Sequence, residues 1–141
     1  ELINEGVLAE QFIAQHLAYR LGGVEAPELA YWLREGKTVN AEVDFAISLG
    51  PQILPIEVKA GKSGSLKSLQ QFVLSKNVHL ACRFDLNPPS HQAISHHLES
   101  NAEPISFHLT SLPLYLVEEL TRVVDALSGK ASSNVTPALC R

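Results

Sequence analysis

The sequence predicts an α/β domain in which helices flank a mixed sheet. A long amphipathic segment opens the chain, three short strand-like segments follow it, and a helical segment and a buried strand come next. Short strands set between helices are typical of α/β and α+β folds. The 141 residues suit one domain with a single core. We expect this domain to span residues 1–127, with residues 128–141 as a loose tail because they show no periodicity.

The first half of the chain supplies one helix and two strands. Apolar residues recur with a period near 3.6 from Leu2 to Leu21, which predicts a helix that Gly22-Gly23 ends. Leu29–Leu33 is short, aromatic and β-prone, and Ala41–Ile47 alternates as a strand does. This alternation predicts two opposite faces for the second strand, with Val43, Phe45 and Ile47 on one and Glu42, Asp44 and Ala46 on the other.

The third strand is expected over Ile53–Lys59, where Pro55 indicates a local edge or a bulge. Ser65 is a suitable N-cap for a second helix that runs to about Lys76. The remaining expected elements are a strand over Val78–Phe84, a short helix over His91–Leu98, a strand over Pro104–Leu109 and a closing helix over Leu114–Leu127.

Composition limits the classes of function. The net charge of −4 argues against a broad non-specific grip on nucleic acid, but metal-dependent nucleases also carry acidic clusters. The longest apolar runs are far shorter than the roughly 20 residues of a membrane span. Cys82 and Cys140 do not make a disulfide framework, so we expect a reducing compartment, the cytoplasm. The chain contains no Met and starts within a helical pattern, so we expect a piece of a longer protein.

Three residues on the second and third strands indicate phosphodiester chemistry. Glu57 and Lys59 are two apart on one strand and share a face, and Asp44 lies on the preceding strand of a predicted hairpin. Two carboxylates can hold a hydrated Mg²⁺ or Mn²⁺ ion, and a lysine can orient water or offset charge on phosphate. The alternative is a solvated polar edge. Apolar neighbours favour the site, because charges beside a core cost free energy unless they are paired or metal-bound.

The same segments carry a family resemblance. Ala41–Ile47 and Leu54–Lys62 resemble the PD-(D/E)XK nuclease-like superfamily, and more narrowly the uncharacterised C-terminal domain of many bacterial and archaeal AAA-type ATPases. Matching segments also occur at Gly6–Glu10, Ala30–Trp32 and Leu112–Leu116. The resemblance implies a restriction-endonuclease-like αβββαβ core, nucleic acid as a partner and an ATPase domain upstream in the same protein.

The resemblance also implies roles for individual residues. Asp44 and Glu57 correspond to the metal-binding carboxylates, and Lys59 corresponds to the catalytic lysine. Glu10 corresponds to an acidic position on the first helix that assists the metal, although a solvent-facing glutamate explains it equally well. Four residues near the site are candidates for nucleic-acid contact: Lys62, Lys67, Gln70 and Gln71.

Two other motifs lack the residues they would need. Gly61-Lys62-Ser63 is similar to the end of a P-loop, but Ile56 stands where the first P-loop glycine is required, so we expect no ATP site in this chain. His91, His96 and His97 lack cysteine partners at zinc-like spacing. Two functional hypotheses remain: a metal-dependent nuclease, or a catalytically silent accessory domain of an ATPase that binds nucleic acid or protein.

Overall fold

The computed structural model describes residues 4–22, 30–34, 41–49, 51–96 and 104–132. The described elements begin with one helix, three strands, a helix and a strand, so the predicted α/β class and its αβββαβ order are confirmed. The elements are α1 (Glu5–Leu21), β1 (Ala30–Arg34), β2 (Ala41–Leu49), β3 (Gln52–Val58), α2 (Lys67–Lys76), β4 (Leu80–Asp85), β5 (Ser90–His96), β6 (Ile105–Pro113), the 3₁₀ helix η1 (Leu114–Glu119) and α3 (Leu120–Ser132).

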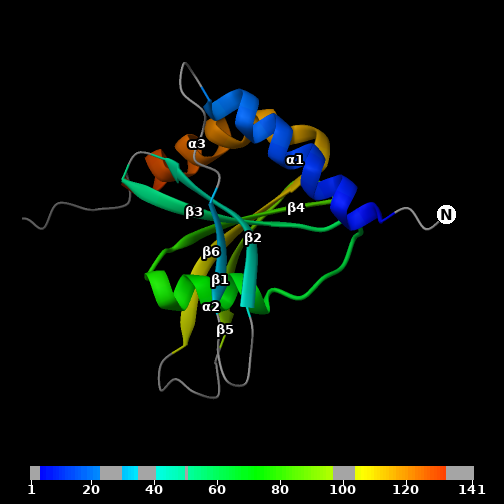
Figure 1. Cartoon of the computed structure of the whole chain (residues 1–141). Helices are drawn as coiled ribbons and strands as arrows, with labels where there is room; N and C mark the ends of the chain where they lie inside the picture. The colour runs from blue at the N-terminus through cyan, green and yellow to red at the C-terminus, as the bar shows by residue number, and fades with distance from the viewer. Residues whose placement is uncertain (1–3, 23–29, 35–40, 50, 97–103, 133–141) are drawn as a thin grey trace, which may run out of the picture.

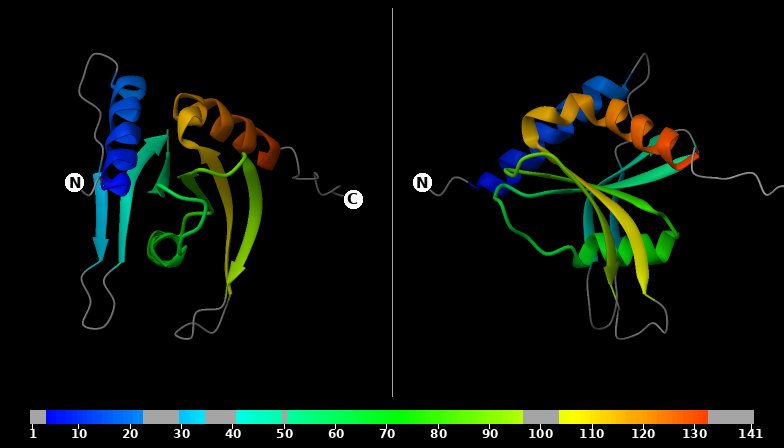
Figure 2. Two further views of the ribbon diagram at one scale, coloured as in Figure 1. Left: turned by 90° about the vertical axis from the view of Figure 1, so that its right-hand side faces the viewer. Right: turned by 180° about the vertical axis from the view of Figure 1, so that it is seen from behind.

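The six described strands form one mixed sheet in the order β1-β2-β3-β4-β6-β5. The first three strands are antiparallel, β3, β4 and β6 are parallel, and β5 returns antiparallel at the edge. Helices α1 and α3 cover one face of this twisted sheet and α2 covers the other (Figure 1). The side view shows α1 over the β1–β3 part and α3 over β5 and β6 (Figure 2).

Two apolar cores hold the three layers together. The core below α1, η1 and α3 includes Ile13, Leu17, Ile56, Val58, Cys82, Phe84 and Leu120. The core above α2 includes Val43, Leu69, Phe72, Val73, Ala81, Phe107 and Leu109. Because successive strand residues point to opposite faces, Glu57 between Ile56 and Val58 projects to the face that α2 covers.

The prediction that Val43 shares a face of β2 with Phe45 and Ile47 is wrong. Phe45 and Ile47 pack in the core below α1, whereas Val43 lies in the core above α2 with Ala46. The pairing register of β1 and β2 shifts by one residue between Ala30↔Ala46 and Trp32↔Val43. Such a β-bulge inserts an extra residue and re-aims the side chains after it, so the strict alternation breaks next to Asp44.

The segment expected as a helix over His91–Leu98 is instead the edge strand β5, as far as His96. Its backbone pairs with β6 along its whole length, from Ser90↔Ser111 to His96↔Ile105. Pairing with an exposed sheet edge outweighs a short, weakly periodic helical pattern, because local propensity is a small term. His97 and Leu98 lie outside the described residues.

The closing helix differs in form and length from its prediction. Its first six residues form the 3₁₀ helix η1, and α3 then continues to Ser132, five residues beyond the expected end of the domain. The rest of the expected tail, 133–141, lies outside the described residues.

The interpretation of Pro55 is supported by the pairing of its strand. Pro55 pairs with Ala46 of β2, and β3 meets β4 only from Ile56 onward. A residue without an N–H therefore occupies the part of β3 that has a neighbour on one side only. The N-cap of α2 is Leu66 and not the predicted Ser65, although the backbone N–H of Lys67 donates to Ser65 Oγ at 3.2 Å.

Candidate functional site

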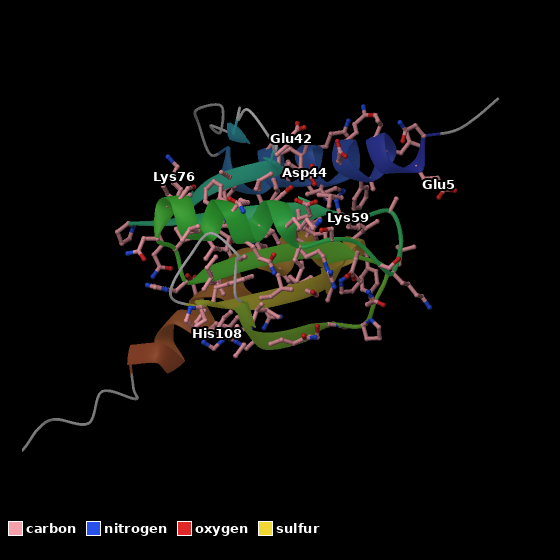
Figure 3. All side chains as sticks on the ribbon, turned by 90° about the horizontal axis from the view of Figure 1, so that it is seen from below. Glu5, Glu42, Asp44, Lys59, Lys76 and His108 are labelled. Carbon is pink, nitrogen blue, oxygen red and sulfur yellow. The ribbon has the colours of Figure 1, made fainter. Side chains whose placement is uncertain are left out.

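The predicted site lies where the parallel strands end. Glu57 is the penultimate residue of β3 and Lys59 follows the strand. Ligand sites in α/β sheets form preferentially at the carboxyl ends of parallel strands. Figure 3 shows Glu42, Asp44 and Lys59 together beside α1 and the N-terminal half of α2, while Lys76 lies at the opposite end of α2.

Glu57 is the most buried member of the site. It is 4% exposed, and its Oε1 accepts a hydrogen bond from Lys59 Nζ. Within the described chain its other oxygen, Oε2, is buried without a hydrogen-bond partner. Burial is the main reason why the pKa of Glu57 is raised, and the bond from Lys59 opposes this rise. A buried, unpaired carboxylate oxygen costs free energy, so it is a position where a cation would be stabilising.

Asp44 joins β2 to β3 through its side chain. Its Oδ2 accepts a hydrogen bond from the backbone N–H of Val58 at 2.6 Å. The ladder between these strands ends at Phe45↔Ile56, so the carboxylate satisfies a backbone group just beyond the ladder. Burial raises the pKa of Asp44, while the Val58 N–H and the Lys59 charge lower it.

Two more carboxylates bring negative charge to the site. Partial burial is the first cause of the raised pKa of Glu10 on α1, followed by the charges of Asp44 and Glu42. Glu42 in turn contributes to the raised pKa of Asp44. The structure therefore brings Glu10 near the predicted core set, with Lys59 as the cation that offsets these charges. Glu42 is an addition that sequence reasoning placed on a strand face without a role.

Gly64 fixes the path of the Lys59 side chain. A Cβ at Gly64 would lie 2.9 Å from Lys59 Cδ and 3.0 Å from Cε. The glycine thus lets the loop before α2 lie directly against the lysine stem, which runs back to Glu57. Sequence reasoning recognised only a small-residue loop here. No local signal distinguishes Gly64 from Gly61, where a Cβ would meet no atom within 4 Å.

The four nucleic-acid candidates differ in their surroundings. Lys62 and Lys67 are exposed, and both lie near the start of α2. Gln70 is a buried residue of α2, with 8% of its surface exposed, so it is part of the interior in this structure. Gln71 is half-buried and makes contacts of its own.

The histidines of the second half lie elsewhere on the sheet. His91 stacks on His108 with ring centroids 5.1 Å apart, and its Nδ1 lies 3.0 Å from Thr110 Oγ1. In Figure 3 His108 lies well away from Asp44 and Lys59. These rings are therefore not part of the carboxylate site.

The carboxylates fit a hydrated ion better than a closed cage. Among the described residues no group of three or more His, Cys, Asp or Glu side chains could hold a metal ion. Mg²⁺, however, is commonly bound by one or two carboxylates and keeps several waters. Glu57, with its unpaired Oε2, and Asp44, with one oxygen used by Val58, supply donors of this kind. The residues therefore fit an open two-carboxylate site for Mg²⁺ or Mn²⁺.

Fold and site together define an α/β protein with a buried carboxylate–lysine pair at the carboxyl ends of its parallel strands. The model of one family, described as Domain of unknown function (DUF4143), matches residues 5–114, and the chain belongs to this family. No curated protein and no solved structure matches the chain. None of the described helices is long and apolar enough to span a membrane.

Proposed function

We propose that this domain is a divalent-metal-dependent phosphodiesterase that acts on nucleic acid, with Asp44, Glu57 and Lys59 as a PD-(D/E)XK site. The single observation that carries the proposal is the buried, unpaired Oε2 of Glu57 beside Asp44 and Lys59. The segment matches around these residues extend the proposal to a cytoplasmic C-terminal domain of a larger AAA-type ATPase, whose nucleotide site lies upstream.

The residues divide the chemistry among them. A bound Mg²⁺ or Mn²⁺ supplies the polarisation of the scissile phosphate and the lowered pKa of an attacking water. Glu57 and Asp44 would hold the cation, and Glu10 adds negative charge from α1. Lys59, whose side chain is 30% exposed, reaches solvent and is placed to orient the water or to neutralise the phosphate. Burial around Glu57 strengthens each of these electrostatic interactions.

Two observations favour the accessory-domain alternative. Lys59 Nζ is already engaged by Glu57, and Asp44 already has a structural partner in the Val58 N–H. In a silent domain these pairs alone would keep the residues in place. The two hypotheses differ in a measurable respect: the enzyme must bind a divalent cation at Asp44 and Glu57 and cleave nucleic acid, and the silent domain does not cleave.

The test is calorimetric titration of Mg²⁺ and Mn²⁺ into the wild type and into Asp44→Asn and Glu57→Gln variants, followed by a plasmid-nicking assay. Asparagine keeps an oxygen that can accept from Val58, so this substitution removes charge with little structural loss. The matched control is Asp125→Asn, an exposed carboxylate on α3. We expect saturable binding that both site variants lose and the control keeps, and nicking that Lys59→Ala abolishes.

The opposite result has an equally clear meaning. A wild type that binds neither cation and nicks neither strand contradicts the phosphodiesterase and leaves the accessory domain. Cation binding with no cleavage of DNA or RNA, by the domain or by the full ATPase chain, would reduce the site to a structural metal centre.

A further inference from the structure

Arg83 on β4 lies directly beside the catalytic glutamate. It is the partner of Glu57 in the parallel pairing of β3 with β4. The residues on either side of it, Cys82 and Phe84, lie in the core below α1, so Arg83 projects to the α2 face as Glu57 does. A cation on a buried strand is rare unless it is paired, so this position requires an explanation.

Arg83 forms its ion pair with Asp85 on its own strand and not with Glu57. Arg83 Nε lies 2.9 Å from Asp85 Oδ2, with side chains 17% and 1% exposed respectively, but within the described chain Nε is buried and makes no hydrogen bond. Glu57 Oε2 meanwhile has no hydrogen-bond partner. Within the described residues this is the only ion pair of Arg83, and a guanidinium carries five N–H donors, so donors remain for a further anion.

Asp85 is itself held in place. Its Oδ1 accepts from the backbone N–H of Asn87 at 2.8 Å, and its Oδ2 accepts from Asn87 Nδ2 at 3.0 Å. Asn87 Nδ2 also donates to the Lys62 carbonyl at 2.8 Å, and the Leu86 N–H donates to the Gly61 carbonyl at 3.2 Å. The turn that orients Arg83 is thus tied to the loop that follows Lys59. Arg83 and Lys59 therefore both keep a fixed position relative to Glu57.

We propose that Arg83 is a substrate-binding residue that contacts the phosphodiester backbone of the nucleic acid at the Asp44–Glu57–Lys59 site. This inference rests on the proposed function and names its substrate contact. A polyanion approaching four carboxylates needs a fixed positive group besides Lys59, and a guanidinium binds two phosphate oxygens at once. Because Arg83 already lies beside the buried Asp85, its guanidinium loses less conformational entropy when it binds phosphate.

The test measures binding apart from catalysis. Fluorescence anisotropy follows a labelled DNA oligonucleotide and an RNA of the same sequence, each with Ca²⁺ and again with EDTA, over a range of salt. The variants are Arg83→Gln and Arg83→Lys, and the control is Arg122→Gln on α3, whose side chain is 76% exposed. Arg83→Gln should weaken binding by about tenfold. It should also reduce the salt dependence by about one phosphate contact. Arg83→Lys should recover affinity only in part, and Arg122→Gln should match the wild type.

A melting curve accompanies each variant, because Arg83→Gln removes the ion pair of the buried Asp85 and leaves it only the hydrogen bonds from Asn87. If it unfolds, the double variant Arg83→Gln/Asp85→Asn removes both partners and takes its place. A folded Arg83 variant with wild-type affinity and salt dependence overturns the inference while leaving the phosphodiesterase intact. Loss of binding in the variant of a protein that never nicks supports the phosphate contact and contradicts the enzyme. A wild type that binds neither DNA nor RNA overturns both.

Discussion

At the scale of single residues, the position of the Lys59 side chain depends on Gly64. The lysine stem lies against Gly64, where an added Cβ would fall within 3.1 Å of three lysine carbons. We predict that Gly64→Ala moves Lys59 Nζ away from Glu57 and lowers nicking by about tenfold or more, since a small misplacement of a catalytic group is costly. The free energy of unfolding should change by less than about 1 kcal/mol, because the loop is exposed.

Gly61→Ala is the matched control for this substitution. It alters the same loop, and its Cβ would meet nothing within 4 Å. We expect it to nick at the wild-type rate. Equal loss of activity in both variants would show that loop flexibility matters and that the contact with Lys59 does not.

The raised pKa of Glu57 predicts how the stability of the protein depends on pH. Because folding raises its pKa mainly through burial, folding favours its protonated form. Its contribution to stability is therefore complete below the ordinary glutamate pKa and is lost as the pH rises through the raised value. Without divalent metal, Glu57→Gln should unfold about 2–5 °C above the wild type at neutral pH. Near pH 4 the two melting temperatures should converge. A variant that melts below the wild type at neutral pH would show that the bond to Lys59 outweighs burial.

The sequence predicts those site residues that local geometry along the chain brings together, and it misses those that only tertiary contacts bring together. Asp44, Glu57 and Lys59 could be found because a strand period and a hairpin bring them together locally. Gly64 could not, since it matters through one contact in space, and Arg83 was missed because its place beside Glu57 comes from the pairing of β3 with β4. A charge embedded in the apolar β4 was a usable signal for Arg83, of the same kind that identified Glu57.

At the scale of elements, the junction of β2 with β3 depends on a side chain. Asp44 replaces a ladder carbonyl as the acceptor for the buried Val58 N–H, next to the shift in register between β1 and β2. We predict that Asp44→Ala lowers the free energy of unfolding by about 1–3 kcal/mol, the cost of an unsatisfied buried donor. Asp44→Asn should lower it by less than about 1 kcal/mol, because the amide oxygen still accepts. Urea denaturation measures both.

The comparison also separates structure from chemistry at Asp44. Both variants should lose metal binding, whereas the alanine variant should lose more stability than the asparagine variant. Equal stability of the alanine variant and the wild type would contradict the bridging role.

Elements with strong internal patterns were predicted, and those defined by pairing were not. The order from α1 to β4 follows from hydrophobic periodicity and turn residues along the chain. The segment Ser90–His96 has a mixed polar pattern, and it becomes a strand because the edge of β6 offers unpaired backbone groups. The bulge in β2 likewise arises from pairing with β1, so strict alternation misplaced Val43.

At the scale of the whole molecule, a chain with a net charge of −4 must bind a polyanion through a local excess of positive charge. Lys67 and Lys76 test where this excess lies, because they are the first and last residues of α2 and both are exposed. Figure 3 shows Lys76 at the end of α2 away from Asp44 and Lys59, so Lys67, the first residue of α2, is at the end that adjoins the site. Lys67→Gln should weaken nucleic-acid binding about two- to threefold and reduce its salt dependence, while Lys76→Gln leaves both unchanged.

The two substitutions should change the free energy of unfolding in opposite directions. The helix dipole disfavours a cation at the N-terminus of α2 and favours one at its C-terminus. Lys67→Gln should therefore raise the free energy of unfolding, and Lys76→Gln should lower it, each by about 0.3–1 kcal/mol at low salt. A lysine that weakens the fold where it stands is explained by a ligand that needs it there. If the two variants bind nucleic acid equally well, the positive charge that attracts the substrate lies outside α2, at Lys59, Lys62 or Arg83.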